Sequence, residues 1–283
     1  MLRLLLIQIV LLSAAQAFAA EPLKIVTYNI RCLNRSDGED YWPKRVDAVT
    51  DFLSNYDLIG LQEVTKPQFE QLKTRLRGFE SYGIGRSDGK SGGEHAAIFY
   101  RRDRLEMLSK GTFWLSETPD QVGVKGWDAD LPRTCTWMVL KQRDGGAQVW
   151  VANTHFDHRG VQARTESAKL IRRMANQRGE GLPAIVMGDF NCLPGSDPYQ
   201  ALTTAEIPDS SPLTDARQAS EQKPSGPRST WNGFSKIIPE RIIDYLFVAG
   251  PLTVRTVEVL DPRTESGRFA SDHLPVTASI ELK

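Results

Sequence analysis

The 283-residue sequence has no excess of charge of either sign and, beyond its first twenty residues, no long hydrophobic run. Lysine and arginine together number 35, and so do aspartate and glutamate. Proteins that grip long stretches of duplex DNA usually have a basic surface, so the overall charge gives no support for that class, although a local basic patch stays compatible with it. No internal segment is apolar enough over a sufficient length to span a bilayer.

The one long hydrophobic run lies at the N-terminus, in "MLRLLLIQIVLLSAAQAFAA". A basic residue, a short apolar core and the small-residue pattern "AFA" follow one another, as in a secretory signal peptide. Gln8 and Ser13 interrupt the core, so a retained membrane anchor is the less favoured interpretation. We predict that residues 1–20 are a signal peptide and that residues 21–283 form a single domain of an exported monomer, with no stable membrane insertion after cleavage.

Cysteine is scarce, and the three present are Cys32, Cys135 and Cys192. Their spacing suits neither a zinc site nor a thiol redox motif. An odd number in an exported chain leaves at least one thiol unpaired unless two chains are cross-linked. Cys32 and Cys192 each follow a polar motif at a strand end, which allows a bond between them. We favour the alternative of three isolated thiols.

Short runs rich in β-branched and aromatic residues recur along the chain, with patterns of helical period between several of them. Some runs are apolar on both faces, as buried central strands are, and others alternate. This predicts two sheets packed face to face with helices outside, although periodicity alone is compatible with other α/β layouts. The predicted strands are 24–30, 58–64, 95–101, 135–142, 148–156, 184–190, 241–248, 254–260 and 275–282, and the predicted helices lie in 43–56, 66–77 and 161–175.

Polar side chains stand at the margins of six of these segments. Taken alone, an aspartate or histidine in such a place is usually a turn, cap or hydrogen-bonded residue. Together they supply what metal-assisted hydrolysis of a phosphoester needs: oxygen ligands for Mg²⁺, a base for water, and imidazoles for developing charge. The residues are Asn29, Glu63, His155, Asp157, His158, Asp189, Asn191, Asp244, Asp272 and His273.

In chain order, "TYNIR", "LQEV", "NTHFDH", "GDFNCLPGSDPY", "RIIDYLFV" and "SDHLPV" resemble the motifs of the endonuclease/exonuclease/phosphatase (DNase I-like) superfamily, in its secreted bacterial branch. The resemblance covers essentially all of the chain after the signal peptide. "GDFN" followed downstream by "SDH" is its most specific part. The resemblance implies a four-layer α/β/β/α sandwich of two packed mixed sheets, with the site where the sheets open at one edge.

The resemblance also implies a cation site. Glu63 would be the main ligand of Mg²⁺, with Asn29 beside it and Asp272 completing the acidic pocket. Mg²⁺ typically keeps several waters and takes only one or two protein carboxylates, which agrees with this set. Mn²⁺ is the alternative ion at the same ligands.

Five further residues match catalytic positions of the superfamily. Asp189 would orient or deprotonate the attacking water, and Asn191 would hold a phosphate oxygen. His155 would donate to the phosphate, and Asp244 would pair with His273, fix its tautomer and favour its charged form. The general base is either Asp189 or the Asp244–His273 pair, and both assignments stay open.

The supporting residues each have two interpretations. Glu94 either supports the first imidazole of "NTHFDH" or is a plain surface residue. Asp157 and His158 either border the substrate or stabilise their loop. Arg31 and Arg133 either bind phosphate oxygens through their planar forks or form ordinary salt bridges.

The sequence thus predicts an exported, Mg²⁺-dependent phosphoric-ester hydrolase acting on phosphodiesters or phosphomonoesters of modest size. "GDFNCLPGSDPYQAL" looks more like the deadenylase-like branch and its secreted relatives than like base-excision endonucleases or inositol-polyphosphate phosphatases. A non-specific extracellular nuclease is the chief alternative, which makes nucleic acid a candidate partner. A sphingomyelinase-like lipid phosphodiesterase, for which no exposed aromatic hairpin is evident, and a catalytically inactive binding module are the others.

Overall fold

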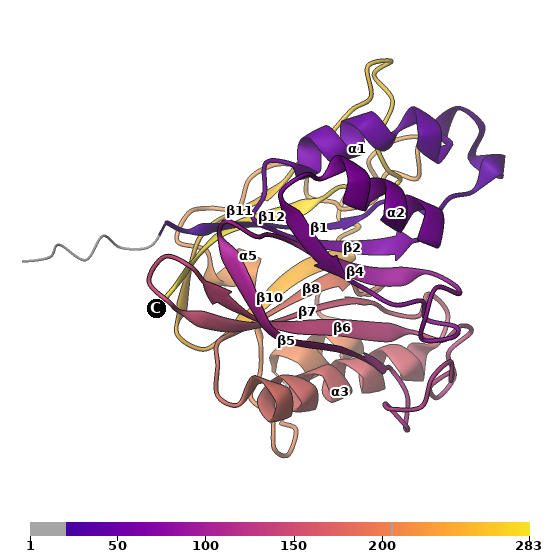
Figure 1. The fold of residues 1–283 in the computed structure, drawn as a ribbon. Coiled ribbons are helices and arrows are strands. Elements are labelled where there is room, and N and C mark those ends of the chain that lie inside the picture. The colour runs from indigo at the N-terminus through magenta and orange to yellow at the C-terminus, as the bar shows by residue number, and fades with distance from the viewer. Residues whose placement is uncertain (1–20, 205) are drawn as a thin grey trace, which may run out of the picture.

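The computed structural model describes residues 21–204 and 206–283, so the signal peptide predicted for residues 1–20 lies outside the described residues. Two six-stranded sheets face each other, and helices cover their outer faces (Figure 1). The prediction of a four-layer α/β/β/α sandwich of two mixed sheets is therefore confirmed. Within the described residues, no helix combines the length and the apolar character needed to cross a membrane.

The first sheet has the strand order β11-β12-β1-β2-β4-β3. Only its β1–β2 pair is parallel, and the other neighbours are antiparallel. Both parallel strands therefore end at the same edge of the sheet. The strands are β1 (Leu23–Asn29), β2 (Leu58–Val64), β3 (Phe79–Tyr82), β4 (His95–Arg101), β11 (Leu252–Val259) and β12 (Val276–Leu282).

The second sheet repeats this design, with the order β5-β6-β7-β8-β10-β9. Its one parallel pair is β7–β8, and β10 runs antiparallel to β8. The end of β8 thus adjoins the end of β7 on one side and the start of β10 on the other. The strands are β5 (Leu105–Trp114), β6 (Thr134–Gln142), β7 (Gln148–His155), β8 (Ala184–Asp189), β9 (Thr214–Asp215) and β10 (Asp244–Ala249).

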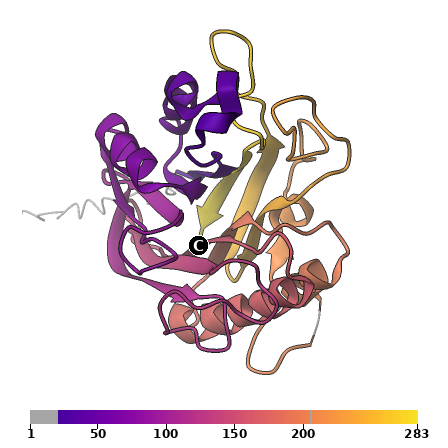
Figure 2. The ribbon, with the colours of Figure 1, turned by 90° about the vertical axis from the view of Figure 1, so that its right-hand side faces the viewer.

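Helices lie on opposite sides of the sandwich (Figure 2). Helices α1 and α2 pack on the first sheet, and α3 and α4 pack on the second. Helix α2 begins with a capping box, in which Thr65 and Gln68 satisfy backbone groups that the first turn leaves free. The helices are α1 (Val46–Leu53), α2 (Lys66–Arg75), α3 (Val161–Gly179), α4 (Asp197–Thr203) and α5 (Ala216–Ala219), with 3₁₀ helices η1 (Arg35–Asp40) and η2 (Trp42–Lys44).

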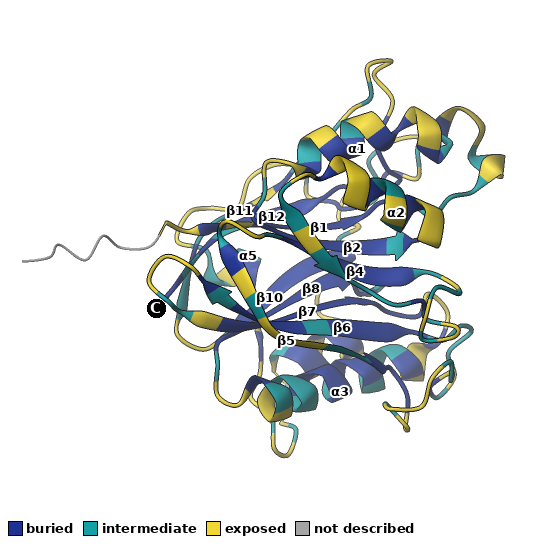
Figure 3. Cartoon of the chain, viewed as in Figure 1, coloured by how far each residue is buried: buried dark blue, intermediate teal, exposed yellow. Residues whose placement is uncertain are grey.

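Three apolar layers hold the sandwich together. Successive strand residues point to opposite faces, so Ile25 of β1 packs between the sheets while Val26 packs under α1 and α2. On β8, Met187 likewise faces inward and Val186 faces α3. Central strands are accordingly buried on both faces, whereas the outer helix surfaces are exposed (Figure 3). This double burial is the physical reason for the apolar runs that predict these strands.

All nine predicted strands and all three predicted helices form, with small differences at their ends. The sequence pattern does not reveal β3, β5, β9, α4 or α5. Strand β5 lies at a sheet edge and exposes Glu106, Ser109 and Lys110, so it lacks the alternating apolar pattern. The cysteines are free, and no Cys32–Cys192 bond forms, as we favoured.

Candidate active site

The ends of three neighbouring strands bring acidic and imidazole groups together at one edge of the second sheet. Asp189, the last residue of β8, is the register partner of His155 at the end of β7 and of Asp244 at the start of β10. Gly188 is needed beside it, because a Cβ there would lie 2.2 Å from the carbonyl oxygen of Thr154. Strand pairing alone therefore places His155 and Asp244 on either side of Asp189.

The first sheet presents Asn29 and Glu63 to the same place. Asn29 ends β1 and pairs in register with Gln62, so Glu63 is the next residue along β2. The β2–β4 ladder is irregular between Leu61 and Val64, and Glu63 has φ = +60°. Bulges and left-handed residues other than glycine are costly and concentrate at sites where a side chain must be aimed. The bulge gives Glu63 its direction.

The Asn29 amide joins the two sheets. Its Nδ2 group donates to Glu63 Oε1 at 3.1 Å and to Asp189 Oδ2 at 3.0 Å. The other Glu63 oxygen, Oε2, accepts the backbone N–H of Cys32 at 3.0 Å. Neutral donors thus fix the positions of both carboxylates.

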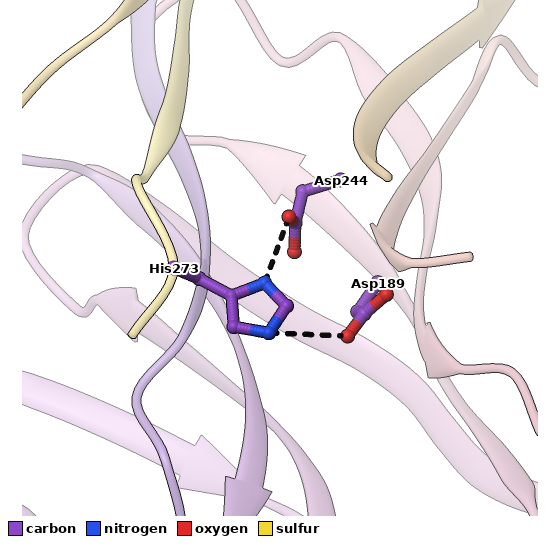
Figure 4. Close-up of side chains that lie close together, drawn as sticks. All are labelled: Asp189, Asp244 and His273. Carbon is purple, nitrogen blue, oxygen red and sulfur yellow. Dashed lines mark hydrogen bonds and ion pairs between the residues drawn. The ribbon is translucent and has the colours of Figure 1, made fainter. Parts of the chain in front are cut away.

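His273 lies between Asp244 and Asp189 (Figure 4). Its Nδ1 atom is 2.9 Å from Asp244 Oδ2, and its Nε2 atom is 3.7 Å from Asp189 Oδ2. Burial lowers the pKa of His273, but the negative charges of Asp244 and Asp189 outweigh it and raise that pKa to about 10. Burial and the charge of Asp244 raise the pKa of Asp189 to about 7. The trio therefore holds a proton on the imidazole at neutral pH.

His155 is a buried, uncharged imidazole on the other side of Asp189. Its Nε2 atom lies 3.4 Å from Asp189 Oδ2. Burial and the nearby Arg133 and Arg86 charges lower its pKa far below the usual range. Within residues 21–204 and 206–283, its Nδ1 atom has no hydrogen-bond partner. It lies 4.0 Å from Glu94 Oε2, which is 2.8 Å from Arg86 Nη1. Glu94 is therefore near His155, but its direct partner is Arg86.

Asn191 follows Asp189 in a left-handed turn, with φ = +46°. Its backbone N–H donates to Asp189 Oδ1 at 2.9 Å, and its Nδ2 group donates to the Phe156 carbonyl at 3.1 Å. Asparagine tolerates this conformation better than most residues. One amide hydrogen of Asn191 is left for a ligand.

The other supporting residues divide between loop and cleft. Asp157 is buried, and its carboxylate accepts backbone N–H groups of Leu131, Arg159 and Gly160 at 3.2, 3.0 and 2.8 Å. These bonds outweigh burial and hold its pKa well below the usual range. Asp157 thus stabilises its loop, whereas His158 lines the cleft.

The two predicted arginines both lie at the cleft and both have acidic partners. Arg31 donates to both carboxylate oxygens of Asp37, at 3.1 and 3.0 Å, and lies 4.0 Å from Asp272. Arg133 is buried, with Nε 3.4 Å from Asp157 and Nη2 donating to His158 Nδ1 at 3.1 Å. Its Nη1 group has no hydrogen-bond partner among the residues that the structure describes. Arg133 therefore combines a salt bridge with a free donor.

Most of these groups line a cleft of about 430 Å³, whereas Asn29, Asp157, Asp244 and Asp272 are not part of its lining. Six of its lining residues are not among the site residues that the sequence predicts. Trp231 stands edge-on to His273, with ring centroids 4.7 Å apart. A tryptophan in the polar, glycine-containing stretch "STWNGF" was the available signal. The six residues are Cys32, Arg86, Leu131, Trp231, Arg241 and Ile243.

The residues expected to hold a cation fit that task. Glu63 and the buried Asp272 supply hard oxygen donors, and Asn29 Oδ1 accepts only the Arg31 N–H. Burial, and the repulsion by Glu63, raise the pKa of Asp272. Acids that repel each other in a buried site are a good match for Mg²⁺ or Mn²⁺.

Asp189, Asp244 and His273 also bring ligand atoms within 4.8 Å of one another. Both His273 nitrogens face carboxylates, and the raised pKa keeps them protonated. A protonated imidazole has no lone pair for a cation. Among the described residues, the set of Glu63, Asn29 and Asp272 is therefore the better candidate cation site.

Known proteins of similar sequence and structure agree with this fold and with the position of the candidate site. The model of the Endonuclease/Exonuclease/phosphatase family matches residues 26–273, a span that includes every predicted site residue. The structure of an endonuclease/exonuclease/phosphatase from Bacteroides vulgatus is 37% identical in sequence, with a TM-score of 0.86 over 92% of this chain and 99% of that one. A mannosyl-6-phosphatase from Bacteroides thetaiotaomicron is also 37% identical, with a TM-score of 0.82 over 91% and 99% of the two chains.

Mouse nocturnin is 23% identical, in an alignment that covers 92% of this chain and 66% of nocturnin. This chain therefore spans just under two thirds of the length of that relative.

Proposed function

This chain belongs to the endonuclease/exonuclease/phosphatase family, and on that premise we propose that it is an exported, Mg²⁺-dependent phosphoester hydrolase. One observation carries the proposal: three groups from distant parts of the chain converge on a single oxygen, Oδ2 of Asp189. Asn29 lies 3.0 Å from it, His155 3.4 Å and His273 3.7 Å. Such convergence at the open edge of two sheets is what water activation beside a bound phosphate requires.

We assign the proton-accepting role to Asp189. At neutral pH a carboxyl with a pKa of about 7 can take a proton from water, whereas His273 is already protonated. His273 would then stabilise negative charge on the phosphate, with Asp244 holding its ring. His155 and Asn191 would donate to phosphate oxygens. When bound at Glu63, Asn29 and Asp272, Mg²⁺ supplies positive charge that stabilises the charge developing on the phosphate.

We propose a sugar phosphomonoester as the first substrate class to test. Support comes from the similarity to a mannosyl-6-phosphatase and from the free Nη1 donor of buried Arg133, which suits an additional phosphate oxygen. Polynucleotides and lipid phosphodiesters are the alternative substrates.

The test is hydrolysis of mannose 6-phosphate, p-nitrophenyl phosphate and bis(p-nitrophenyl) phosphate, with and without EDTA, followed by restoration with Mg²⁺ or Mn²⁺. We expect phosphate release that EDTA abolishes and the cation restores. Full activity in EDTA would remove the cation from the proposal. Plasmid nicking or sphingomyelin cleavage faster than all monoester hydrolysis would instead favour one of the alternatives. No activity on any phosphoester would favour an inactive binding module.

Export and the monomeric state are separate proposals. N-terminal sequencing of the protein from cell fractions should find a chain that begins near residue 21 outside the cytoplasm. Gel filtration with light scattering should give the mass of one chain. A cytoplasmic protein that keeps its first twenty residues would contradict the export proposal.

A further inference from the structure

We propose that Arg45 is a positioning residue, which holds the cation ligands Asn29 and Asp272 at their working separation. The inference rests on the proposed cation site. Arg45 is outside the cleft, and no sequence motif points to it. It touches neither substrate nor cation, so its effect on the reaction would pass through the backbone that carries the ligands.

The Arg45 guanidinium binds carbonyl oxygens from separate loops. Its Nη1 group donates to Ile30 at 3.0 Å and to Ala270 at 2.6 Å, and its Nε group donates to Asp40 at 2.5 Å. Ile30 directly follows the ligand Asn29, and Ala270 lies two residues before the ligand Asp272. One side chain thus connects backbone segments that are 240 residues apart in the chain, close beside two of the three ligands.

The surroundings of Arg45 show that burial of its charge destabilises the folded state. The side chain has no exposed surface, and its guanidinium lies 5.5 Å from the Trp42 ring and 5.1 Å from the Phe234 ring. The nearby Asp40 carboxylate instead binds Arg268, with Nε 2.7 Å from Oδ1. A buried charge without a close counter-ion destabilises the fold relative to a well-packed neutral side chain. Only a guanidinium, however, offers a rigid fork of donors that can join several carbonyls.

The ligand Asp272 lies in the loop before β12. Its carbonyl accepts the backbone N–H groups of Asn232 and Gly233 at 2.9 and 3.0 Å, which hold the loop to that segment but not to β1. Besides Arg45, one hydrogen bond in the described part of the chain links this loop to β1: Ser271 Oγ donates to the Asn29 carbonyl at 2.7 Å. Without the Arg45 bond at Ala270, the loop could move relative to Asn29. The cation would then lose its oxygen geometry, to which Mg²⁺ is particularly sensitive.

Arg172 provides a matched control elsewhere in the molecule. It is also buried, and it donates to the carbonyls of Ala201, Ser210 and Ser211 at 2.8, 3.1 and 3.1 Å. These bonds join α3 to α4 and to the loop that follows, away from the lining of the cleft. Replacement of either arginine breaks the same kind of bonds, but only Arg45 is next to cation ligands.

The experiment measures Mn²⁺ binding to the purified protein by electron paramagnetic resonance of the free ion, together with thermal unfolding. The variants are Arg45→Lys, Arg45→Met and the control Arg172→Lys. We expect Arg45→Lys to weaken Mn²⁺ binding about 10–100-fold, as loss of an outer-shell partner typically does. Arg45→Met should weaken it further. Arg172→Lys should lower the unfolding temperature and leave the Mn²⁺ Kd unchanged. At saturating Mn²⁺, the kcat of Arg45→Lys should recover toward the wild-type value.

Three results would overturn the inference. The first is a folded Arg45→Lys variant with the wild-type Kd, and the second is an equal loss of affinity in Arg172→Lys. The third is the absence of saturable Mn²⁺ binding to the wild type, which would also remove the cation site from the proposed function. If neither Arg45 variant folds, Phe234→Leu decides, because it removes only the ring beside the guanidinium. A raised Kd in that variant supports the inference, and an unchanged Kd overturns it.

Discussion

Asp189 and Asp244 are register partners on adjacent antiparallel strands, so two buried carboxylates stand side by side with His273 between them. Two neighbouring acids cannot both ionise cheaply in a buried site unless positive charge accompanies them. The imidazolium of His273 supplies that charge. The trio therefore titrates as one unit, and a change in any member alters the pKa of the others.

The first prediction concerns pH. Because the pKa of His273 is raised to about 10, its protonated form is present at neutral pH and is lost as the pH rises through that value. We expect kcat/KM to rise with pH as Asp189 ionises and to fall near pH 10 as His273 loses its proton. Because a bound cation favours the charged carboxylate, the rise should lie below pH 7 when the cation is present. Asp244→Asn should move the falling limb to lower pH by roughly one unit or more, since it removes the largest stabilising charge. A falling limb that does not move would contradict the pairing.

The second prediction separates activity from stability. Asp189→Asn should reduce kcat by about 10²–10⁴-fold if Asp189 is the general base. Its folded pKa is raised, so its ionisation is a cost to the folded state, most of all above pH 7. The Asn variant should therefore unfold in urea at pH 8 no earlier than the wild type. Near-normal turnover would show that Asp189 is not the base.

Asp157→Asn is the counterpart, and it should show the opposite pattern. The Asp157 carboxylate accepts three backbone N–H groups, and its lowered pKa stabilises the fold above the usual carboxyl pKa. We expect a loss of about 1–3 kcal/mol in the free energy of unfolding at pH 7, and most of the activity retained in the folded protein. A stability equal to that of the wild type would indicate that the loop does not need this carboxylate.

The third prediction concerns the cation. Glu63→Gln should raise the Mg²⁺ concentration that gives half-maximal activity by at least about tenfold, because it removes a ligand rather than an outer-shell partner. Isothermal titration with Mg²⁺ should show the same change. Glu94→Gln is the matched control, because the Glu94 carboxylate is paired with Arg86. An equal effect in both variants would assign the cation to a different place in the cleft.

The fourth prediction concerns phosphate binding. Arg133→Met removes a buried donor that has no protein partner, so it should raise the KM of a phosphomonoester by about 10–100-fold, the value of a hydrogen bond to a charged group. Arg133→Lys keeps the positive charge but loses the planar fork of donors, so its KM should lie between those of the wild type and Arg133→Met. Circular dichroism checks that the fold survives loss of the Asp157 contact. An unchanged KM in a folded Arg133→Met variant would assign Arg133 to the loop alone.

The sequence by itself determined which segments become central strands and which polar residues end them. Central strands of a sandwich must be apolar on both faces. A polar residue at the last position of such a strand, such as Asn29 or Asp189, can therefore be recognised from the sequence alone. Local patterns also distinguish the helices, because the 3.6-residue period of an amphipathic helix is a property of consecutive residues. These local signals predict two packed sheets with helices outside, and the resemblance of the motifs adds the four-layer order and the roles of the candidate site residues.

Only the tertiary structure decided which strand ends meet. Sheet order and register depend on pairing between distant segments, and nothing in a strand's own pattern specifies its neighbour. The placement of Asp189 between His155 and Asp244 is of this kind. So is the role of Arg45: an arginine at the start of a helix normally points to solvent, and its burial became visible once carbonyls from distant loops surrounded it. Local sequence encodes the period and the chemistry of each segment, whereas long-range packing sets the distances on which catalysis depends.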